Sequence, residues 1–149
     1  MKESELAFWQ KMARHYTKCM DRSAPLYAAV CERIRPHLSR DMNVLELACG
    51  TGQLSFPLSP SVRLWEATDA APAMIQEAKK RIGSSRLHFS VQDAGHLPYA
   101  PESFDAVVIA NALHILPEPD RVLREIQRVL KPGGWLFAPT FVHGGGRLA

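Results

Sequence analysis

Five short apolar runs, each followed by a turn or helix signal, constrain most strongly what this chain can fold into. In sequence order they are NVLELA, VRLWEATD, RLHFSVQD, FDAVVIAN and GWLFAPTF. Several of them are nearly continuous in apolar residues, as expected for strands that are buried on both faces of a sheet. The segments between them, best developed at residues 71–83 and 118–134, place apolar side chains at helical spacing. This alternation predicts an α/β fold with a doubly wound, mostly parallel sheet of five strands.

The segment before the first run is predicted to form a helical cap over residues 1–40. Apolar residues recur near a period of 3.6 through most of it, and Ser23 and Pro25 indicate a break between two helices. The chain of 149 residues contains no internal repeat and no interdomain linker. We therefore expect a single domain, with the sheet at residues 43–141.

Composition argues against several other classes of protein. The formal net charge of +3 is too small to indicate a nucleic-acid partner. The three cysteines, Cys19, Cys31 and Cys49, lack the paired spacing of a zinc site or a disulfide framework, so no metal is expected. No apolar run approaches the ~20 residues of a membrane span, and the N-terminus lacks a signal-peptide core, so a cytoplasmic location is the default expectation.

The first run ends in a glycine-rich loop, VLELACGTGQ at residues 44–53, which is the candidate ligand site. Ligands of doubly wound sheets bind at the carboxyl ends of the strands, and glycines let them approach the backbone closely. A dinucleotide-binding turn would need a third glycine where this chain has Ser55. It would also bring a pyrophosphate towards Glu46, whose negative charge would repel it. The loop suits a ligand that is positively charged there, such as S-adenosylmethionine, which carries an ammonium, a sulfonium and no phosphate.

Together with three later segments, this loop resembles the class I S-adenosylmethionine-dependent methyltransferases. VLELACGTG resembles motif I of that family, an acidic residue followed by alternating glycines. EATDAAPAMIQEAKKR resembles its second-strand segment, VQDAGHLPYAPESFDAVVIANALHIL its third- and fourth-strand segment, and LREIQRVLKPGGWLFAPT its fifth-strand segment. The resemblance covers residues 43–141, and it is nearest to small-molecule enzymes of the ubiquinone/menaquinone-biosynthesis type, with a methyltransferase type 11 domain.

The resemblance implies which residues would hold the methionine part of this cofactor. Glu46 would orient the ammonium group, directly or through water. Backbone atoms of the loop would line the methionine and the ribose at Ala48, Cys49, Gly50 and Gly52. Asn111 would face the methionine through its backbone, and Tyr16 resembles a lid tyrosine that some relatives close over the cofactor.

The adenosine part would be held where the second and third strands end. Asp69 would accept hydrogen bonds from both ribose hydroxyls, because a carboxylate offers two charged acceptor oxygens to a diol. Ala70 and Met74 would pack on the adenine, and Asp93 and Ala94 would meet its amino edge. The alternatives are a helix-start role for Asp69 and a turn role for Asp93.

The implied activity is methyl transfer to a small-molecule acceptor. Transfer from a sulfonium is an in-line displacement, which needs alignment and exclusion of water more than a catalytic pair. His114 is the candidate base for an acceptor that must lose a proton, with packing or a lid role as the alternative. Cys49 is expected to be a small buried residue and not a nucleophile. Two other interpretations stay open, a protein that binds S-adenosylmethionine without methyl transfer and a nucleotide-dependent oxidoreductase.

Departures from the family pattern carry expectations of their own. Ala48 replaces a glycine and is expected to keep a negative φ, and Ala71 replaces a capping serine at a cost of about 1 kcal/mol. The sixth and seventh strands usual in the family are expected to be missing. We therefore expect the edge beside Trp135, Leu136 and Phe137 to pair with another chain, which would give a homo-oligomer.

Overall fold

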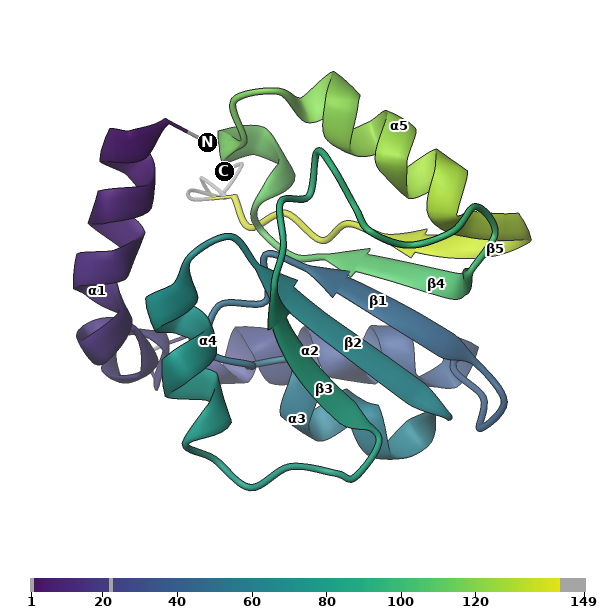
Figure 1. Cartoon of the computed structure of the whole chain (residues 1–149). Coiled ribbons are helices and arrows are strands. Elements are labelled where there is room, and N and C mark those ends of the chain that lie inside the picture. Colours follow the sequence, from purple (N-terminus) through teal and green to yellow (C-terminus); the bar gives the residue numbers. More distant parts are fainter. Residues whose placement is uncertain (1, 22, 143–149) are drawn as a thin grey trace, which may run out of the picture.

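A parallel sheet forms the centre of the fold in the computed structural model, which describes residues 2–21 and 23–142. Its five strands are β1 (Asn43–Leu47), β2 (Leu64–Asp69), β3 (Leu87–Val91), β4 (Phe104–Ile109) and β5 (Leu130–Phe137). They lie in the order β3-β2-β1-β4-β5, and every neighbouring pair is parallel (Figure 1). The predicted α/β architecture with five strands is confirmed, and within the described residues no further strand joins the sheet.

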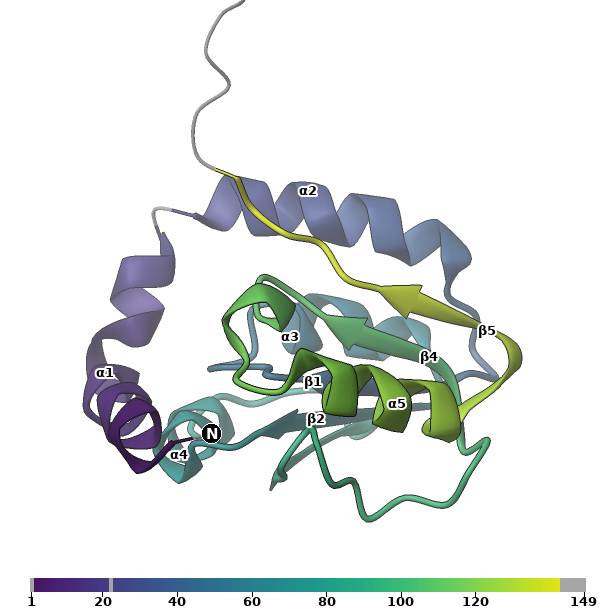
Figure 2. The same cartoon turned by 90° about the horizontal axis from the view of Figure 1, so that it is seen from above.

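Helices cover both faces of this sheet. One face carries α2 (Ala24–Ile34), α3 (Ser55–Leu58) and α4 (Pro72–Lys79), and the other carries α5 (Pro119–Val129). Figure 2 shows α2 and α5 on opposite sides of the strands. Because consecutive strand residues point to opposite faces, Val44 joins the apolar cluster beneath α2, α3 and α4, whereas Leu45 joins the cluster beneath α5.

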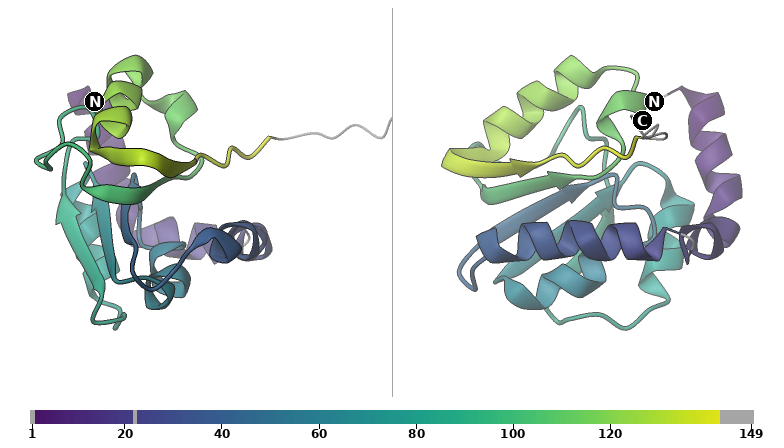
Figure 3. Two further views of the ribbon diagram at one scale, coloured as in Figure 1. Left: turned by 90° about the vertical axis from the view of Figure 1, so that its right-hand side faces the viewer. Right: turned by 180° about the vertical axis from the view of Figure 1, so that it is seen from behind.

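The N-terminal helices divide the predicted cap into two parts. Helix α1 (Glu3–Asp21) stands across the end of the sheet where the strands terminate, and α2 lies along one face (Figure 3). The break predicted at Ser23 and Pro25 is confirmed, since α2 begins between them at Ala24. Single 3-10 turns follow at η1 (Arg35–His37), η2 (Ser59–Ser61) and η3 (Leu113–Ile115). Over the described ranges, no helix is long and apolar enough to cross a membrane.

Two helices on the same face of the sheet are short. The helix after the glycine loop, α3, has four residues including Pro57, and the chain then continues as the single 3-10 turn η2, which contains Pro60. Helix α4 ends at Lys79, before the end of the predicted segment at residues 71–83. Residues 80 and 81 continue only as a turn, with the N–H of Lys80 donating to the carbonyl oxygen of Glu77 (3.2 Å).

The fifth strand lies earlier in the chain than the predicted run at residues 134–141. It begins at Leu130, directly after α5, because Leu130 pairs with Phe104 of β4. The register then shifts before pairing resumes, and Gly133 permits the bulge with a φ of 77°. The predicted strand was therefore right in kind and wrong in its bounds.

After β5 the chain passes in front of the end of β4. The backbone N–H of Asn111 donates to the carbonyl oxygen of Pro139 (2.7 Å), and the N–H of Phe141 donates to Oδ1 of Asn111 (3.2 Å). The ring of Phe141 then packs edge-on against Tyr27 of α2, with 5.1 Å between ring centroids. These contacts end the strand at Phe137 and place the following segment beside the carboxyl end of the sheet.

Candidate functional site

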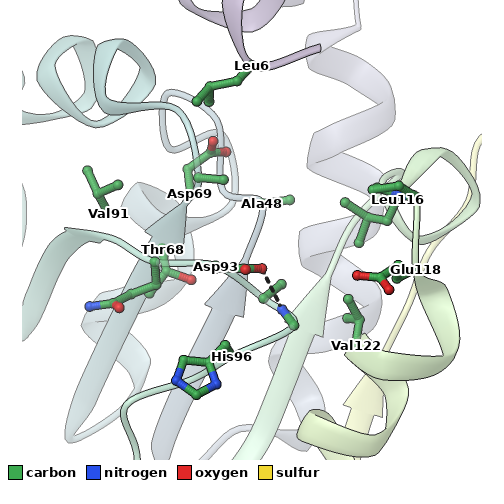
Figure 4. Close-up of a pocket in the computed structure, with 15 residues that line it drawn as sticks. Leu6, Ala48, Thr68, Asp69, Val91, Asp93, His96, Leu116, Glu118 and Val122 are labelled. Atoms are coloured by element: carbon green, nitrogen blue, oxygen red, sulfur yellow. Dashed lines mark hydrogen bonds between the residues drawn. The ribbon is translucent and has the colours of Figure 1, made fainter. Parts of the chain in front are cut away.

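A cleft opens beneath α1 at the carboxyl ends of the strands. It has two parts, a larger cavity of about 480 Å³ and a smaller cavity of about 300 Å³. Both are lined by Ala48, Asp69 and Leu116, so they are neighbouring halves of one site. Figure 4 shows the larger cavity, with Asp69 and Asp93 on one side and Glu118 opposite them. Volumes of this size are typical of small-molecule sites.

Most residues singled out from the sequence line this cleft. Those in the larger cavity are Ala48, Asp69, Ala70, Asp93 and Ala94. Those in the smaller cavity are Tyr16, Ala48, Gly50, Asp69, Met74, Asn111 and His114. Met74, which the sequence assigned to the adenine, thus borders the smaller half only. Three predicted residues line neither half, namely Glu46, Cys49 and Gly52.

The loop after β1 turns through three left-handed backbone positions. Ala48 has a φ of 53°, Gly50 of 58° and Gly52 of 95°. The expectation that Ala48 keeps a negative φ is therefore wrong. The loop turns sharply onto β2, where the N–H of Cys49 donates to the carbonyl oxygen of Thr68 (2.9 Å), and this turn forces Ala48 into a conformation that costs an L-residue about 1–2 kcal/mol.

Tyr16 of α1 lies directly over the open face of the loop. A Cβ atom added at Gly50 would be 2.9 Å from Cε1 of Tyr16, so a side chain at Gly50 would displace the ring. Trp9, two turns earlier on α1, packs edge-on against Tyr16 with 6.1 Å between ring centroids. Burial raises the pKa of Tyr16, and the neighbouring Tyr27 hydroxyl and Asp69 carboxylate raise it further. The Tyr16 hydroxyl therefore stays neutral and can donate or accept a hydrogen bond inside the cleft.

Asp69 is held rigidly at the junction of the two halves. Its Oδ2 accepts a hydrogen bond from the backbone N–H of Gly50, and its Oδ1 accepts one from the N–H of Ala71, both at 2.9 Å. Burial raises the pKa of Asp69, while these backbone donors lower it. Since each carboxylate oxygen can accept more than one hydrogen bond, both oxygens keep capacity for a ligand in the cleft.

The charged side chains that line the cleft are acidic. They are Asp69, Asp93 and Glu118, and the cleft also contains two histidines, His96 and His114. No lysine or arginine is among its described lining residues, although Arg121 lies beside Gly95 and pairs with Glu118 (3.5 Å) at the rim. The Oδ1 atom of Asp93 accepts a hydrogen bond from the N–H of Gly95 (2.8 Å), which fixes that carboxylate at the floor of the larger half. Such a lining repels phosphate groups and favours a ligand with positive charge.

Glu46 lies on the other side of the loop, inside the core. It is 3% exposed, and its Oε2 accepts hydrogen bonds from Nε1 of Trp65 (2.8 Å) and from Oγ of Ser55. Burial raises the pKa of Glu46 to about 7, Ser55 and Trp65 pull it down, and Asp69 pushes it up. Trp65 is completely buried in the core, and its indole N–H has this polar role as well.

Cys49 and Gly52 support the loop from behind. Cys49 is buried, as expected of a small apolar residue, and burial raises the pKa of its thiol well above the usual value, which leaves it unreactive. A Cβ atom at Gly52 would lie 2.5 Å from Cε2 of Phe56, so that position tolerates no side chain without repacking. In the part of the chain that the structure describes, no group of three or more His, Cys, Asp or Glu residues is arranged to hold a metal ion.

Helix α1 also supplies the cap that α4 lacks. Ala71 precedes α4 and makes no side-chain cap, in line with the sequence. The side chain of Gln10 fills this role, because its Oε1 accepts a hydrogen bond from the N–H of Ala73 (2.9 Å). Gln10 therefore ties the helix above the cleft to the first turn of α4, which carries Met74 into the smaller half.

Several lining residues come from segments without any motif and were not predicted from the sequence. Those named only by the structure include Leu6, Trp9, Tyr27, Ile115 and Glu118. Trp9 lines the smaller half and also packs against the small buried cluster of Ala13, Ala71 and Met74. Leu6, Trp9 and Tyr16 fall on one stripe of α1 and could have indicated a helix that faces the cleft. Nothing in the sequence signals Tyr27 or Glu118.

Comparison with known proteins assigns the family. The sequence profile of a family described as a methyltransferase domain matches residues 45–138. The chain is 41% identical over 99 residues to a demethylmenaquinone methyltransferase from Clavibacter sepedonicus, covering 66% of this chain and 40% of that protein. It is 39% identical over 93 residues to a ubiquinone/menaquinone biosynthesis C-methyltransferase from Desulfotalea psychrophila, covering 61% and 38%. The chain thus spans about two fifths of the length of these relatives.

Solved structures share the fold. A DhpI–SAH complex is 33% identical and superposes with a TM-score of 0.71, covering 89% of this chain and 65% of that one. A methyltransferase in complex with the Haloferax volcanii Trm112 methyltransferase activator is 27% identical, with a TM-score of 0.77 and coverage of 87% and 58%. On these matches and the fold, the chain belongs to the class I S-adenosylmethionine-dependent methyltransferases, in the methyltransferase-domain family related to the menaquinone methyltransferases.

Proposed function

We propose that this chain binds S-adenosylmethionine in the cleft and transfers its methyl group to a small-molecule acceptor. The observation that carries the proposal is Asp69, a carboxylate fixed by two backbone donors at the junction of the cavities. A ribose placed there would offer its two hydroxyls to the two carboxylate oxygens. The adenine would then lie in the larger half and the methionine in the smaller half.

In the larger half, Ala70 would pack against the adenine, and Asp93 with Ala94 would meet its amino edge. In the smaller half, Gly50 would approach the methionine with its backbone, Asn111 would face it from the end of β4, and Tyr16 would close over it. Ala48, common to both halves, would border the ribose, and Met74 would pack beside the methionine. Cys49 and Gly52 would act only by shaping the loop from behind.

The acidic lining separates this ligand from a dinucleotide. A pyrophosphate in the cleft would face the carboxylates of Asp69 and Asp93, and the nearest arginine, Arg121, is already paired with Glu118. The ammonium and sulfonium of S-adenosylmethionine have the opposite charge. This difference also argues against a nucleotide-dependent oxidoreductase.

The acceptor would enter through the smaller half, beside the methionine. Trp9, Tyr27 and Ile115 give this half aromatic and aliphatic walls, and His114 lies among them. Where the acceptor must lose a proton, its O–H or N–H bond breaks as the new bond to the methyl carbon forms, and His114 would take the proton. An acceptor whose attacking atom carries a free lone pair and no such proton would not need the imidazole.

We also propose that the chain forms a homo-oligomer through the outer edge of β5. Trp135 is 46% exposed and stacks on Phe137, with 5.7 Å between ring centroids. In the described residues β5 pairs only with β4, so an edge with aromatic side chains is available to another chain. Light scattering over a range of concentrations, with a Phe137→Lys variant alongside, tests this, and a strictly monomeric protein at high concentration would exclude it.

Titration calorimetry tests the cofactor directly. We expect heat of binding for S-adenosylmethionine and S-adenosylhomocysteine and weaker or no binding of NAD. Tighter binding of NAD than of S-adenosylhomocysteine would overturn the proposal. Incubation with methyl-labelled S-adenosylmethionine and a panel of small acceptors then separates an enzyme from a binding protein, because only an enzyme passes the label on.

A further inference from the structure

Glu46 is a buried carboxyl group with no basic partner in its described surroundings. Its two donors are neutral, the Ser55 hydroxyl from α3 and the Trp65 indole N–H from β2. The titratable groups that share its electrostatic field are likewise acidic or neutral. They are Asp69 of β2, Tyr27 and Cys31 of α2, and Cys49 of the loop.

An ion so placed is costly. A buried carboxylate without a cation raises its pKa and takes up a proton, because the low-dielectric interior stabilises charge poorly. Two neutral donors offset only part of that cost. For Glu46 the result is a pKa of about 7, so this carboxyl is partly neutral at ordinary pH.

We propose that Ser55 and Trp65 set the charge of Glu46, and that a cationic ligand on the front of the glycine loop drives one proton from this carboxyl into the solvent. The inference rests on the proposed function, in which the ammonium of S-adenosylmethionine lies at the loop. In this step the carboxyl O–H bond breaks, the electron pair stays on the carboxylate, and the buffer takes the proton. Ser55 and Trp65 touch no ligand and act through Glu46, so they are positioning residues.

The proton release gives the affinity a defined pH dependence. A nearby positive charge lowers the pKa of a carboxyl group, so Glu46 is ionised in the complex and partly protonated in the free protein. Below a pH of about 7 the ligand must displace the proton, and affinity falls by about tenfold for each further pH unit until the pKa of the complex is reached. Above that pH, Glu46 is ionised in both states and its contribution is constant.

Substitutions at the two donors distinguish this role from a purely structural one. Trp65→Phe and Ser55→Ala each remove a hydrogen bond to the ionised carboxylate and so raise the pKa of Glu46 in the free protein. The pH below which affinity begins to fall, here called the break, should therefore move to a higher value. Glu46→Gln keeps an oxygen that can accept from both donors and has no proton to release, so the break should disappear. Glu66→Gln is the matched control, because Glu66 is a half-buried glutamate of β2 that does not line the cleft.

The test is calorimetric titration of the full chain with S-adenosylhomocysteine, in two buffers of different ionisation heat, at about pH 6 and about pH 8.5. We expect release of nearly one proton at the lower pH in the wild type and in Glu66→Gln, and almost none in Glu46→Gln or at the higher pH. Equal proton release by the wild type and Glu46→Gln at about pH 6 would overturn the inference. Absence of any binding heat would instead overturn the proposed function.

An infrared spectrum of the unliganded protein provides a second measurement that needs no ligand. A protonated carboxyl group has a C=O stretching band that a carboxylate lacks. We expect such a band at about pH 6 in the difference spectrum between the wild type and Glu46→Gln, and its loss on raising the pH through neutrality. The difference isolates Glu46 from Asp69 and Glu66, whose pKa values are raised as well. If the two proteins give identical spectra at the lower pH, Glu46 is already ionised and the inference fails.

Discussion

Two carboxylates at the ends of neighbouring strands, Asp69 and Glu46, occupy opposite sides of the same loop. Asp69 at the end of β2 borders both halves of the cleft and is held by backbone N–H groups. Glu46 near the end of β1 faces the core and is held by two side chains. Strand alternation alone would direct both to the face of Val44, because Glu46 pairs with Ala67 and Asp69 lies two residues further along β2. Asp69 differs because it is the last residue of β2, beyond the pairing with β1, whereas Glu46 lies within the paired part of the sheet. An acidic residue in a ligand-binding motif can therefore act from behind the loop as well as from its front.

The largest effect should come from the front of the loop. In the proposed function, Asp69→Ala would remove two charge-assisted hydrogen bonds to the ribose, each contributing about 1.5–3 kcal/mol, so affinity for S-adenosylhomocysteine should fall by about tenfold or more. Asp93→Ala should cost less, because Asp93 would meet only one edge of the adenine. Calorimetry measures both, with Asp120→Ala in α5 as a control outside the cleft. Unchanged affinity in a folded Asp69→Ala protein would remove Asp69 from the site.

The comparison also shows what the sequence could predict. Asp69, Asp93 and Gly50 were predicted because each lies at or just after the end of a predicted strand, at a spacing that the family shares, and the strands themselves follow from their apolar runs. The environment of Glu46 was not predicted. Strand alternation places it on the face of Val44, but its donors come from residues 9 and 19 positions away, and their approach depends on how α3 and β2 pack.

The residues that sequence analysis missed share a physical cause. Tyr27 and Glu118 reach the cleft through the packing of whole helices, and no local pattern records that packing. Gln10 caps α4 from α1, across a separation of 63 positions. The bounds of β5 were displaced for a similar reason, since pairing with β4, and not local propensity, determines where the strand begins.

The second effect belongs to the back of the loop and concerns stability. The pKa of Glu46 is raised from 4.5 to about 7 in the folded protein, so the folded state binds this proton more tightly than the unfolded chain does. The contribution of this proton to the free energy of unfolding is fully present at low pH. It is lost as the pH rises from about 4.5 to about 7, by about 3 kcal/mol in all. Glu46→Gln should not show this loss.

Denaturant unfolding at a series of pH values measures this contribution as the difference between the wild type and Glu46→Gln. Asp69 is not an equivalent control, because its own pKa is raised and its carboxylate holds the loop. Glu66→Gln is the comparison variant and not a neutral one, because burial raises the pKa of Glu66 too; it measures the pH dependence of a half-buried glutamate away from the loop and the cleft. If the free energies of unfolding of the wild type and Glu46→Gln depend on pH in the same way, Glu46 is ionised throughout. The proposed difference between Glu46 and Asp69 in protonation would then be wrong.

A third effect compares the two glycines of the loop. Gly52→Ala introduces a Cβ 2.5 Å from the Phe56 ring at a φ of 95°, so the free energy of unfolding should fall by about 2 kcal/mol or more. Gly50→Ala meets the Tyr16 ring at 2.9 Å and occupies the surface on which the methionine would lie. Its cost in stability should be smaller, and its main result should be weaker binding. Melting and calorimetry on both variants check this division, which fails if Gly52→Ala weakens binding more than Gly50→Ala does.

The smallest effect should come from Ala48, which connects the two sides of the loop. Its φ of 53° costs an alanine about 1–2 kcal/mol, whereas glycine adopts this conformation freely and loses about 0.5–1 kcal/mol through the entropy of the unfolded chain. Ala48→Gly should therefore raise the free energy of unfolding by about 0.5–1 kcal/mol, or a few degrees in Tm.

Ala67→Gly is the matched control, because Ala67 is a buried alanine within β2, beside Glu46 in the sheet. There the same substitution removes a packed methyl group from an ordinary strand conformation, so it should destabilise the protein. Opposite signs for the two variants would show that the loop, and not alanine itself, carries the strain. Binding of S-adenosylhomocysteine to Ala48→Gly should stay nearly unchanged, because Asp69 and the backbone of Gly50 remain in place. If Ala48→Gly destabilises the protein as Ala67→Gly does, the left-handed conformation at Ala48 is not held in solution, and the loop must meet its ligand in another shape.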